Sequence, residues 1–257
     1  MSSIFNIRDR HILVTGASSG LGNHFAMMFA EEGARVTVLA RRADRLKGLV
    51  SEIKHRGGDA VALTCDVNDD EALKKAFDDA EKAHGPVQVL VNNAGITRPG
   101  AAVDIKRADW NAVMDTNLNA VWVSSQEMAR RMIAQGTKGS IINIASIGGI
   151  RTFSMVTPYV VSKAGVIAMT RNLAIELAQK GVRVNAIAPG LFDTELGIEY
   201  RASNPGRREG MLSRIPMARL GDYRELDGAM LLLASDASTY MTGEVIVVDG
   251  GYSQNSI

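Results

Sequence analysis

The sequence has 257 residues, of which 46% are hydrophobic and 22% charged, with 29 basic side chains against 28 acidic ones. This composition is typical of a globular protein and excludes the disordered, collagen-like and disulfide-scaffold classes. A formal net charge of +1 provides no basic excess of the kind that binds nucleic acid or an anionic membrane, so we expect a small-molecule partner, no nucleic acid and no membrane.

Three features bear on the cellular compartment. Cys65 is the single cysteine, so the chain can form no internal disulfide, which is typical of reducing compartments. The first residues contain Arg8, Asp9 and Arg10 and lack the apolar core of a signal peptide. No apolar run approaches the roughly 18 residues that a membrane-spanning helix needs. We therefore expect a cytoplasmic location.

Short apolar segments rich in Val, Ile and Leu alternate with helical patterns along the whole chain. We predict strands at Ile12–Thr15, Arg35–Ala40, Ala60–Cys65, Val87–Val91, Ser140–Ala145, Arg183–Ile187 and Glu244–Val248. Helices are predicted near Leu21–Glu32, Ala43–Arg56, Asp69–His84, Lys106–Gln135, Pro158–Gln179 and Tyr223–Ser235. Strands that are apolar almost throughout are typical of a parallel sheet covered on both faces. The alternation predicts an α/β fold of the Rossmann type, a doubly wound, seven-stranded parallel sheet between two layers of helices.

The alternating pattern runs unbroken to Val248, which predicts one domain over residues 1–257. One polar stretch with Pro and Gly, Asp193–Arg214, lies inside this pattern and is long for a loop in a compact domain. Loops at the ligand-binding edge of such a sheet often carry function. We therefore expect residues 191–215 to form a lid over a substrate site.

A glycine-rich loop follows the first predicted strand and opens directly into a helix. It reads Thr15-Gly16-Ala17-Ser18-Ser19-Gly20-Leu21-Gly22. The glycines permit a tight turn, a close approach of the backbone to a diphosphate, and packing of the helix against the strand. The helix N-terminus supplies free N–H donors, and Ser18 and Ser19 add hydroxyl groups. We predict that this loop binds a dinucleotide, the alternative being a plain turn between strand and helix.

Two arginines follow the second predicted strand, where dinucleotide-binding folds recognise the adenosine ribose. Counting about 20 positions from Gly22 reaches Arg41 and Arg42, and no carboxylate occurs from Val36 to Ala43. A carboxylate there would bind the ribose hydroxyl of NAD, whereas a guanidinium suits the additional phosphate of NADP. We therefore expect NADP to be preferred, with NAD as the alternative and Arg41 as the phosphate contact. Arg42 is a second candidate contact. The alternative for both arginines is a pair of solvated charges at the start of the next helix, and it fits Arg42 better than Arg41.

A second group of polar side chains follows the fifth predicted strand. Ser146 ends that strand, and Tyr159 and Lys163 lie four residues apart on one face of the next helix. A tyrosine with a pKa of about 10 is a poor base at neutral pH. A neighbouring ammonium and the positive charge of an oxidised nicotinamide both favour the phenolate, so Tyr159 becomes a usable acid and base. Ser146 is placed to donate a hydrogen bond to a substrate oxygen.

These motifs resemble those of the single-domain branch of the short-chain dehydrogenase/reductase family, and the resemblance covers essentially the whole chain. The motifs that carry it are Thr15-Gly16 to Gly20-Leu21-Gly22, Asn92-Asn93-Ala94-Gly95 and Tyr159 to Lys163. The family's serine falls on Ser146, and its helix asparagine falls on Asn117. The resemblance implies an oxidoreductase that transfers a hydride between NADP and a ketone or secondary alcohol.

The resemblance also implies a role for each matched residue. Tyr159 would be the general acid in reduction, and Lys163 would hold the nicotinamide ribose and lower the pKa of the tyrosine. Ser146 would position the carbonyl group, and Asn117 would hold a water that relays protons to Lys163. The implied cofactor contacts also include Asp66 and Val67 at the adenine, Asn93 and Ala94 on the ribose side, Pro189, Gly190 and Thr194 at the nicotinamide carboxamide, and the adjoining Gly95 and Phe192.

Some of these residues have purely structural alternatives. Asn117 could bond within its own helix, Asp66 could cap the helix that follows, and Pro189-Gly190 could form a plain turn. The spacing of the four histidines matches no metal site, so we predict no catalytic metal.

Two stretches are expected to wall the substrate pocket, residues 147–156 and the lid. Their apolar side chains with a few polar anchors fit a medium-sized hydrophobic ketone. We expect substrate contacts from Ser146, Ile150, Phe153, Met155, Tyr159 and Leu196. Family members that reduce 3-oxoacyl carrier proteins commonly have Gly-Gln-x-Asn before the tyrosine, where this chain has Ser154-Met155-Val156-Thr157-Pro158. A 3-oxoacyl-thioester reductase is therefore the less favoured alternative.

Two other classes of function remain as alternatives. A cofactor-binding regulatory protein without catalysis is disfavoured because Tyr159 and Lys163 are intact. An epimerase or dehydratase of the longer branch of the family is disfavoured by the length of the chain. The family resemblance finally implies a homotetramer, formed through the helices near Lys106–Gln135 and Pro158–Gln179 and the last strand.

Overall fold

The computed structural model describes residues 4–193, 210 and 212–255, and among these residues seven parallel strands form one sheet. The strands are β1 (His11–Thr15), β2 (Arg35–Ala40), β3 (Asp59–Thr64), β4 (Val89–Asn92), β5 (Gly139–Ile144), β6 (Val182–Pro189) and β7 (Val245–Val248). Their order across the sheet is β3-β2-β1-β4-β5-β6-β7. The predicted doubly wound, seven-stranded parallel sheet is confirmed.

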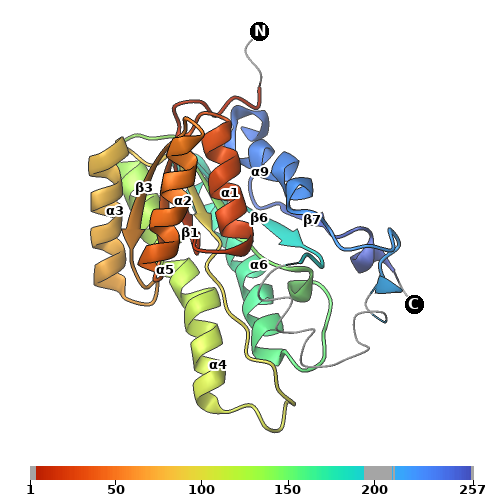
Figure 1. Ribbon diagram of the computed structural model, residues 1–257. Helices are drawn as coiled ribbons and strands as arrows, with labels where there is room; N and C mark the ends of the chain where they lie inside the picture. The colour runs from red at the N-terminus through yellow and green to blue at the C-terminus, as the bar shows by residue number, and fades with distance from the viewer. Residues whose placement is uncertain (1–3, 194–209, 211, 256–257) are drawn as a thin grey trace.

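Helices cover both faces of the sheet (Figure 1). On one face lie α1 (Gly20–Glu31), α2 (Ala43–His55) and α9 (Asp227–Ala234). On the other lie α3 (Asp70–His84), α5 (Ala120–Ala134) and α6 (Thr157–Leu177). The helix predicted over Lys106–Gln135 is instead α4 (Arg107–Met114), a π-helix over Asp115–Asn119, and α5.

Each face of the sheet has its own hydrophobic packing, because successive side chains of a strand point to opposite faces. In β1, Ile12 and Val14 pack with Phe25 and Phe29 of α1, whereas Leu13 packs with Phe77 of α3 on the other face. Both faces of the strands are therefore apolar, which is why these segments of the sequence show no alternation of polar and apolar residues.

The order of the strands reverses beside β1. The chain moves outward from β1 through β2 to β3, then returns to place β4 on the other side of β1 and continues outward to β7. In open sheets of this type, ligands bind beyond the carboxyl ends of the strands at such a reversal. The ends of β1 and β4 are therefore the expected centre of a ligand site.

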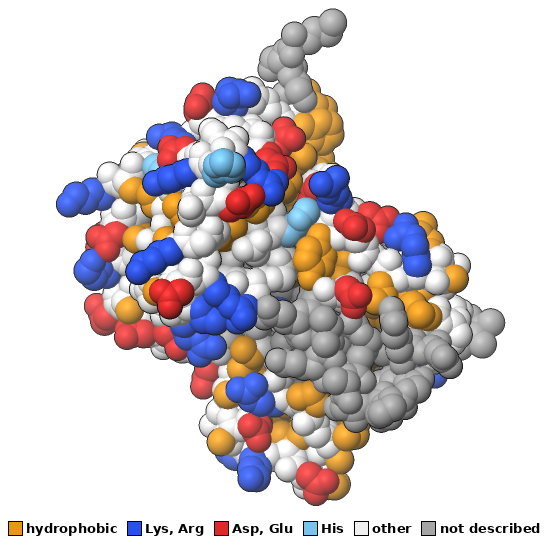
Figure 2. All heavy atoms as spheres, viewed as in Figure 1, with side chains coloured by type: hydrophobic (Ala, Val, Ile, Leu, Met, Phe, Trp, Pro, Cys, Tyr) orange, Lys and Arg blue, Asp and Glu red, His pale blue; other side chains and the backbone are white. Residues whose placement is uncertain are grey.

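Two properties of the surface were also predicted from the sequence. Among the described residues, no helix is both long and apolar enough to cross a membrane. Acidic and basic side chains are interspersed on the face shown in Figure 2, particularly over the left and upper parts of the view. Side chains of both signs are therefore mixed on this face.

Candidate active site

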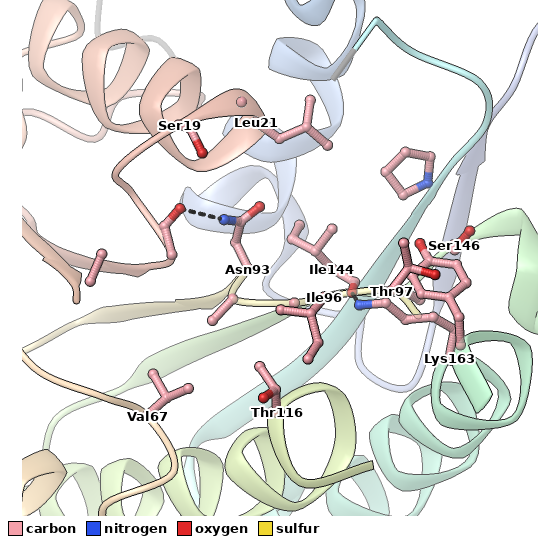
Figure 3. A pocket seen from close by; sticks show the side chains of 18 of the residues that line it. Ser19, Leu21, Val67, Asn93, Ile96, Thr97, Thr116, Ile144, Ser146 and Lys163 are labelled. Atoms are coloured by element: carbon pink, nitrogen blue, oxygen red, sulfur yellow. Dashed lines mark hydrogen bonds between the residues drawn. The ribbon is translucent and has the colours of Figure 1, made fainter. Parts of the chain in front are cut away.

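A cavity of about 530 Å³ lies along the carboxyl ends of the strands (Figure 3). Its walls come from the segments that follow six strands, within residues 16–21, 40–42, 65–68, 93–98, 144–147 and 189–192, and from Phe153, Val156, Tyr159 and Lys163. Most of the predicted cofactor residues line it. Gly22 does not, and Thr194 and Leu196 lie outside the described residues.

The glycine-rich loop packs against the end of β4. The amide of Asn93 donates hydrogen bonds to the carbonyl oxygens of Thr15 (3.0 Å) and Gly16 (3.3 Å), a contact visible in Figure 3. A Cβ added at Gly22 would lie 2.4 Å from that amide nitrogen, so the close packing of helix on strand requires glycine there. Asn93, predicted as a ribose contact, therefore also holds the loop in shape.

Gly20 is the position at which the loop opens toward a ligand. Its φ of +55° favours glycine, and an added Cβ would meet no protein atom within 4 Å. Because Gly20 lines the cavity and begins α1, the helix N-terminus faces open space with its backbone donors exposed. These residues fit the diphosphate of a dinucleotide.

The two arginines after β2 take different positions. Arg42 donates hydrogen bonds from Nε to the hydroxyl of Ser18 (3.0 Å) and from Nη2 to the hydroxyls of Ser18 (2.9 Å) and Ser19 (2.6 Å). The side chain of Arg41 is 67% exposed, and its Nη1 lies 3.7 Å from Oδ2 of Asp66. The interpretation of Arg42 as a merely solvated charge is wrong, because the serine hydroxyls fix its guanidinium against the loop.

Ser146, Tyr159 and Lys163 meet at the other end of the cavity. Ser146 is 9% exposed, and its hydroxyl accepts a hydrogen bond from the backbone N–H of Gly148 (2.9 Å). The Nζ of Lys163 donates to the carbonyl oxygen of Ile144 (2.7 Å) and lies 5.8 Å from the centre of the Tyr159 ring. The four-residue spacing on α6 thus brings the ammonium close to the phenol, as the sequence predicted.

In the protein by itself, burial shifts the pKa values of both Tyr159 and Lys163. Burial raises the pKa of Tyr159, and a hydrogen bond with Ser146 opposes that change. Burial also lowers the pKa of Lys163 to about 8. The expectation that Lys163 lowers the pKa of Tyr159 included a bound oxidised nicotinamide and stays a prediction, whereas in the protein by itself burial of the phenol dominates.

Asn117 lies fully buried in the π-helix and reaches across to the chain after β4. Its Oδ1 accepts from the N–H of Ile96 (2.8 Å), and its Nδ2 donates to the carbonyl of Ile96 (2.9 Å) and to the hydroxyl of Ser162 (3.1 Å). The alternative of a bond within its own helix is therefore wrong. Asn117 does not line the cavity but connects two segments that do.

Asp66 and Gly190 are the remaining residues for which a purely structural role was the alternative. The cap of α3 is Asp69, which accepts from Ala72 N–H (3.0 Å), so Asp66 is not the helix cap. Asp66 instead accepts from the N–H of Asn68 (3.1 Å) and lines the cavity. Gly190 lies against the C-terminal turn, where an added Cβ would come within 2.6 Å of the Cα of Asp249.

The predicted substrate wall is only partly realised. Phe153 lines the cavity, with its ring centre 5.7 Å from that of Tyr252 near the C-terminus. Ile150 and Met155 do not line the cavity formed by the described residues, and they are 45% and 40% exposed. The loop that carries them folds as a short 3₁₀ turn at residues 147–149, and Met155 adopts a φ of +69°.

Several cavity residues were not predicted. Ile96, Thr97 and Arg98 line it directly after the Asn-Asn-Ala-Gly motif, and Thr116 lines it from the π-helix. The rule that ligands bind beyond the carboxyl ends of strands would have included the first three, since they follow β4. Among the described residues, no cluster of His, Cys, Asp and Glu could hold a metal ion.

The known proteins that this chain resembles over nearly its whole length are named as reductases or dehydrogenases. A family model described as enoyl-(acyl carrier protein) reductase matches residues 16–253. The 3-oxoacyl-(acyl-carrier-protein) reductase FabG of Thermotoga maritima is 41% identical over 239 residues, which are 93% of this chain and 96% of that protein. Galactitol 2-dehydrogenase (L-tagatose-forming) of Cereibacter sphaeroides is 39% identical over 255 residues, 98% of each chain. The crystal structure of a gluconate 5-dehydrogenase from Burkholderia cenocepacia, in complex with NADP and tartrate, superposes with a TM-score of 0.92 at 33% identity over 97% of both chains.

Proposed function

The chain belongs to the short-chain dehydrogenase/reductase family, and from this premise we propose that it interconverts a ketone and a secondary alcohol with a preference for NADPH. One observation carries the proposal. A single cavity joins the open glycine-rich loop at one end to Ser146, Tyr159 and Lys163 at the other. A dinucleotide bound along it would bring its nicotinamide to these three side chains.

Tyr159 is the proposed general acid and base. When bound, the nicotinamide supplies or accepts the hydride. In reduction the Tyr159 hydroxyl donates its proton to the carbonyl oxygen, and in oxidation the phenolate takes the proton from the alcohol. The raised pKa of Tyr159 keeps the phenol protonated at neutral pH, which suits reduction. Ser146 donates a hydrogen bond to the same oxygen and stabilises the charge that develops there.

Lys163 is proposed to hold the cofactor ribose and to lower the pKa of Tyr159 once a ligand is bound. The carbonyl of Ile144 fixes its ammonium, and Asn117 fixes Ile96 beside it. Asn117 is proposed to act through this part of the backbone and through a water that reaches Lys163. The proposed roles of the remaining cofactor residues rest on their place along the cavity wall.

The preference for NADPH is supported by the charges at the adenosine end. Arg41 and Arg42 follow β2 in a segment, Val36 to Ala43, that contains no carboxylate, and the serine hydroxyls hold the guanidinium of Arg42 in place. Two planar cations beside one ribose favour a phosphate on that ribose. The bound NADP in the similar gluconate 5-dehydrogenase is consistent with this preference.

The decisive experiment measures NADPH oxidation with a panel of ketones, comparing the wild-type protein with Tyr159→Phe. We expect the variant to bind NADPH with unchanged affinity and to lose about 100-fold or more in turnover, because the proton donor is removed. Tyr240→Phe serves as the control, since Tyr240 is fully exposed. Turnover by Tyr159→Phe at the wild-type rate would exclude this mechanism.

A 3-oxoacyl-thioester reductase is the second candidate, because the relative from Thermotoga maritima carries that activity in its name. The residues before Tyr159 do not follow the pattern expected for such enzymes. Acetoacetyl-CoA and ethyl acetoacetate, offered beside plain ketones, distinguish the candidates. A kcat/KM at least tenfold higher for the thioester would favour the second one.

We further propose one domain over residues 1–257, a lid over residues 191–215, a cytoplasmic location and a homotetramer. Apolar side chains on two helices support the assembly, because Trp122 and Ile133 of α5 and Val161 and Ile175 of α6 are between 40% and 78% exposed. Exposed apolar side chains on neighbouring helices are typical of an interface.

A further inference from the structure

Thr97 presents an unusual side chain to the cavity. Among the described residues, only its Oγ1 and the Nδ1 of His84 are buried side-chain polar atoms without a hydrogen-bond partner. Thr97 is 5% exposed and lines the cavity, whereas His84 ends α3 and does not. A buried hydroxyl without a partner destabilises the protein, and valine has the same shape without that penalty. The missing partner of Thr97 is therefore best supplied by a molecule that enters the cavity.

The backbone around Thr97 is fixed on both sides. The preceding residue, Ile96, is held at its N–H and its C=O by the buried amide of Asn117 (2.8 and 2.9 Å). The carbonyl of Thr97 itself accepts a hydrogen bond from Nη1 of Arg98 (3.1 Å). A hydroxyl positioned in this way needs little rearrangement to bind a ligand, which is what a contact for specificity requires.

The position of Thr97 indicates which part of a ligand it meets. In Figure 3 its side chain lies between Ile96 and Ser146, with the hydroxyl oxygen on the side of Ser146. In the proposed mechanism, Ser146 and Tyr159 already donate hydrogen bonds to the substrate oxygen that reacts. A threonine hydroxyl donates and accepts, so it suits a neutral hydroxyl or carbonyl oxygen. The chain on either side of Thr97 passes close to the catalytic group, because an added Cβ at Gly95 would lie 3.7 Å from Nζ of Lys163 and Gly100 donates its N–H to the carbonyl of Met155 (2.8 Å). The oxygen that Thr97 binds therefore belongs close to the reacting carbon.

We propose that the Thr97 hydroxyl hydrogen-bonds a second oxygen of the substrate, on the carbon adjacent to the reacting carbon. The protein then prefers ketones that carry a neighbouring hydroxyl or carbonyl group over plain ketones of the same shape. This inference rests on the proposed function, because it concerns the substrate of the same site. It adds a residue that selects the substrate and takes no part in the proton transfer.

The test uses pairs of ketones in which a methyl group replaces the second oxygen: hydroxyacetone with butanone, and acetoin with methyl isopropyl ketone. Thr97→Val removes the hydroxyl at constant shape, and Thr97→Ser retains it. We expect Thr97→Val to lower kcat/KM for the hydroxy ketones about 10- to 100-fold and for the plain ketones less than about threefold. Thr97→Ser should keep the wild-type preference.

Each other outcome contradicts the proposal. An equal loss for both members of a pair means that Thr97 has only a structural role. A weaker affinity for NADPH, measured by fluorescence quenching, means that the missing partner is the cofactor. Unchanged kcat/KM values for every ketone mean that the hydroxyl binds water.

Failure of the proposed function is recognised separately, as a wild-type protein that oxidises no NADPH with any ketone. In that case the melting temperature of the free protein decides. Thr97→Val should leave it unchanged or raise it, because the hydroxyl has no partner to lose. A lower melting temperature overturns the inference.

Discussion

Lys163 lies in the cavity wall, where it is only 4% exposed, and no carboxylate of the described residues pairs with its ammonium. Its one hydrogen bond goes to the carbonyl of Ile144, and burial lowers its pKa to about 8. Such an arrangement costs stability when the ammonium is charged, and a bound ribose hydroxyl would offset part of that cost. The lysine is therefore adapted to a bound ligand more than to the free protein.

This burial makes stability depend on pH in a predictable direction. The unfolded chain keeps Lys163 charged up to a pKa near 10.5, whereas the folded protein releases the proton near pH 8. The penalty is complete below about pH 8 and amounts to about 3 kcal/mol, and it declines as the pH rises from there toward 10.5. Lys163→Met removes it.

Urea denaturation of both proteins near pH 7 and near pH 9.5 measures the effect. The wild-type protein should gain about 2 kcal/mol relative to Lys163→Met between the two conditions. A difference in stability that is the same at both pH values would contradict the assignment.

Arg42 and Arg41 differ in how their guanidinium groups would reach a phosphate of the cofactor. The Arg42 guanidinium is preorganised by Ser18 and Ser19, whereas Arg41 must leave Asp66 to reach a ligand. We expect Arg42→Ala to lower kcat/KM for NADPH about tenfold and that for NADH less than about threefold. Arg41→Ala should act in the same direction.

Lys47→Ala, which removes an exposed cation elsewhere on α2, is the control for a general loss of positive charge. Steady-state kinetics with both cofactors provide the measurement. If neither arginine variant changes the ratio of the two kcat/KM values, the preference for NADPH has another origin.

The elements show which features a sequence can and cannot reveal. The bounds of β2 were predicted correctly because Gly33 before the strand and Arg41 directly after it delimit a short segment rich in β-branched residues. The π-helix over Asp115–Asn119 was not predicted, because a widened turn leaves the helical pattern of apolar residues nearly unchanged. Only the structure reveals that this turn directs Asn117 inward to Ile96.

The first residue of β1, His11, connects three elements at the edge of the sheet opposite the cavity. Its Nδ1 lies 2.7 Å from the carbonyl oxygen of Gly85 after α3, and its Nε2 lies 2.8 Å from the hydroxyl of Thr37 in β2. Burial lowers its pKa from 6.5 to about 4. The folded protein therefore requires a neutral imidazole.

Stability should decline as the pH falls from about 6.5 toward 4, because in that range the unfolded chain binds a proton and the folded protein does not. The expected loss from this histidine approaches about 3 kcal/mol at the acidic limit. The variant His11→Gln has no group at this position that binds a proton, so it should lose less stability than the wild-type protein over the same pH range. Urea denaturation near pH 7 and near pH 4.5 tests this, and equal losses in the two proteins would contradict it.

At the scale of the whole molecule, the alternation of strands and helices was enough to predict the sheet and the edge that holds the site. The contacts between distant segments were not predicted. Arg151 donates to the carbonyl of Ser253, through Nε at 2.7 Å and through Nη2, and Phe153 faces Tyr252, so the C-terminal turn supports the wall of the cavity. The local sequence does not predict such contacts, because each of the two residues in a contact is an ordinary loop residue among its sequence neighbours.

The proposed assembly is tested on the intact protein. We expect light scattering after size-exclusion chromatography to give four times the chain mass of 27.6 kDa. Trp122→Glu with Ile175→Glu should reduce that mass, because a stable interface does not tolerate unpaired charges at its centre. Val103→Glu, at a 93% exposed position outside α5 and α6, is the control. A wild-type protein that elutes as a monomer would refute the tetramer.

Beyond the end of β6, the chain comes back beside Phe192 at Gly221. The two residues form a parallel bridge, Gly221 donates its N–H to the carbonyl of Leu191 (3.0 Å), and a Cβ on Gly221 would come within 2.3 Å of the Phe192 ring. Closing a longer loop costs only about 0.6 kcal/mol for each doubling of its length. The returning end is fixed as well, since Ile215 is 4% exposed and the N–H of Met217 donates to the carbonyl of Gly250 (3.2 Å). A loop of another length grafted between Asp193 and Gly210 should therefore leave β6 and α9 in place.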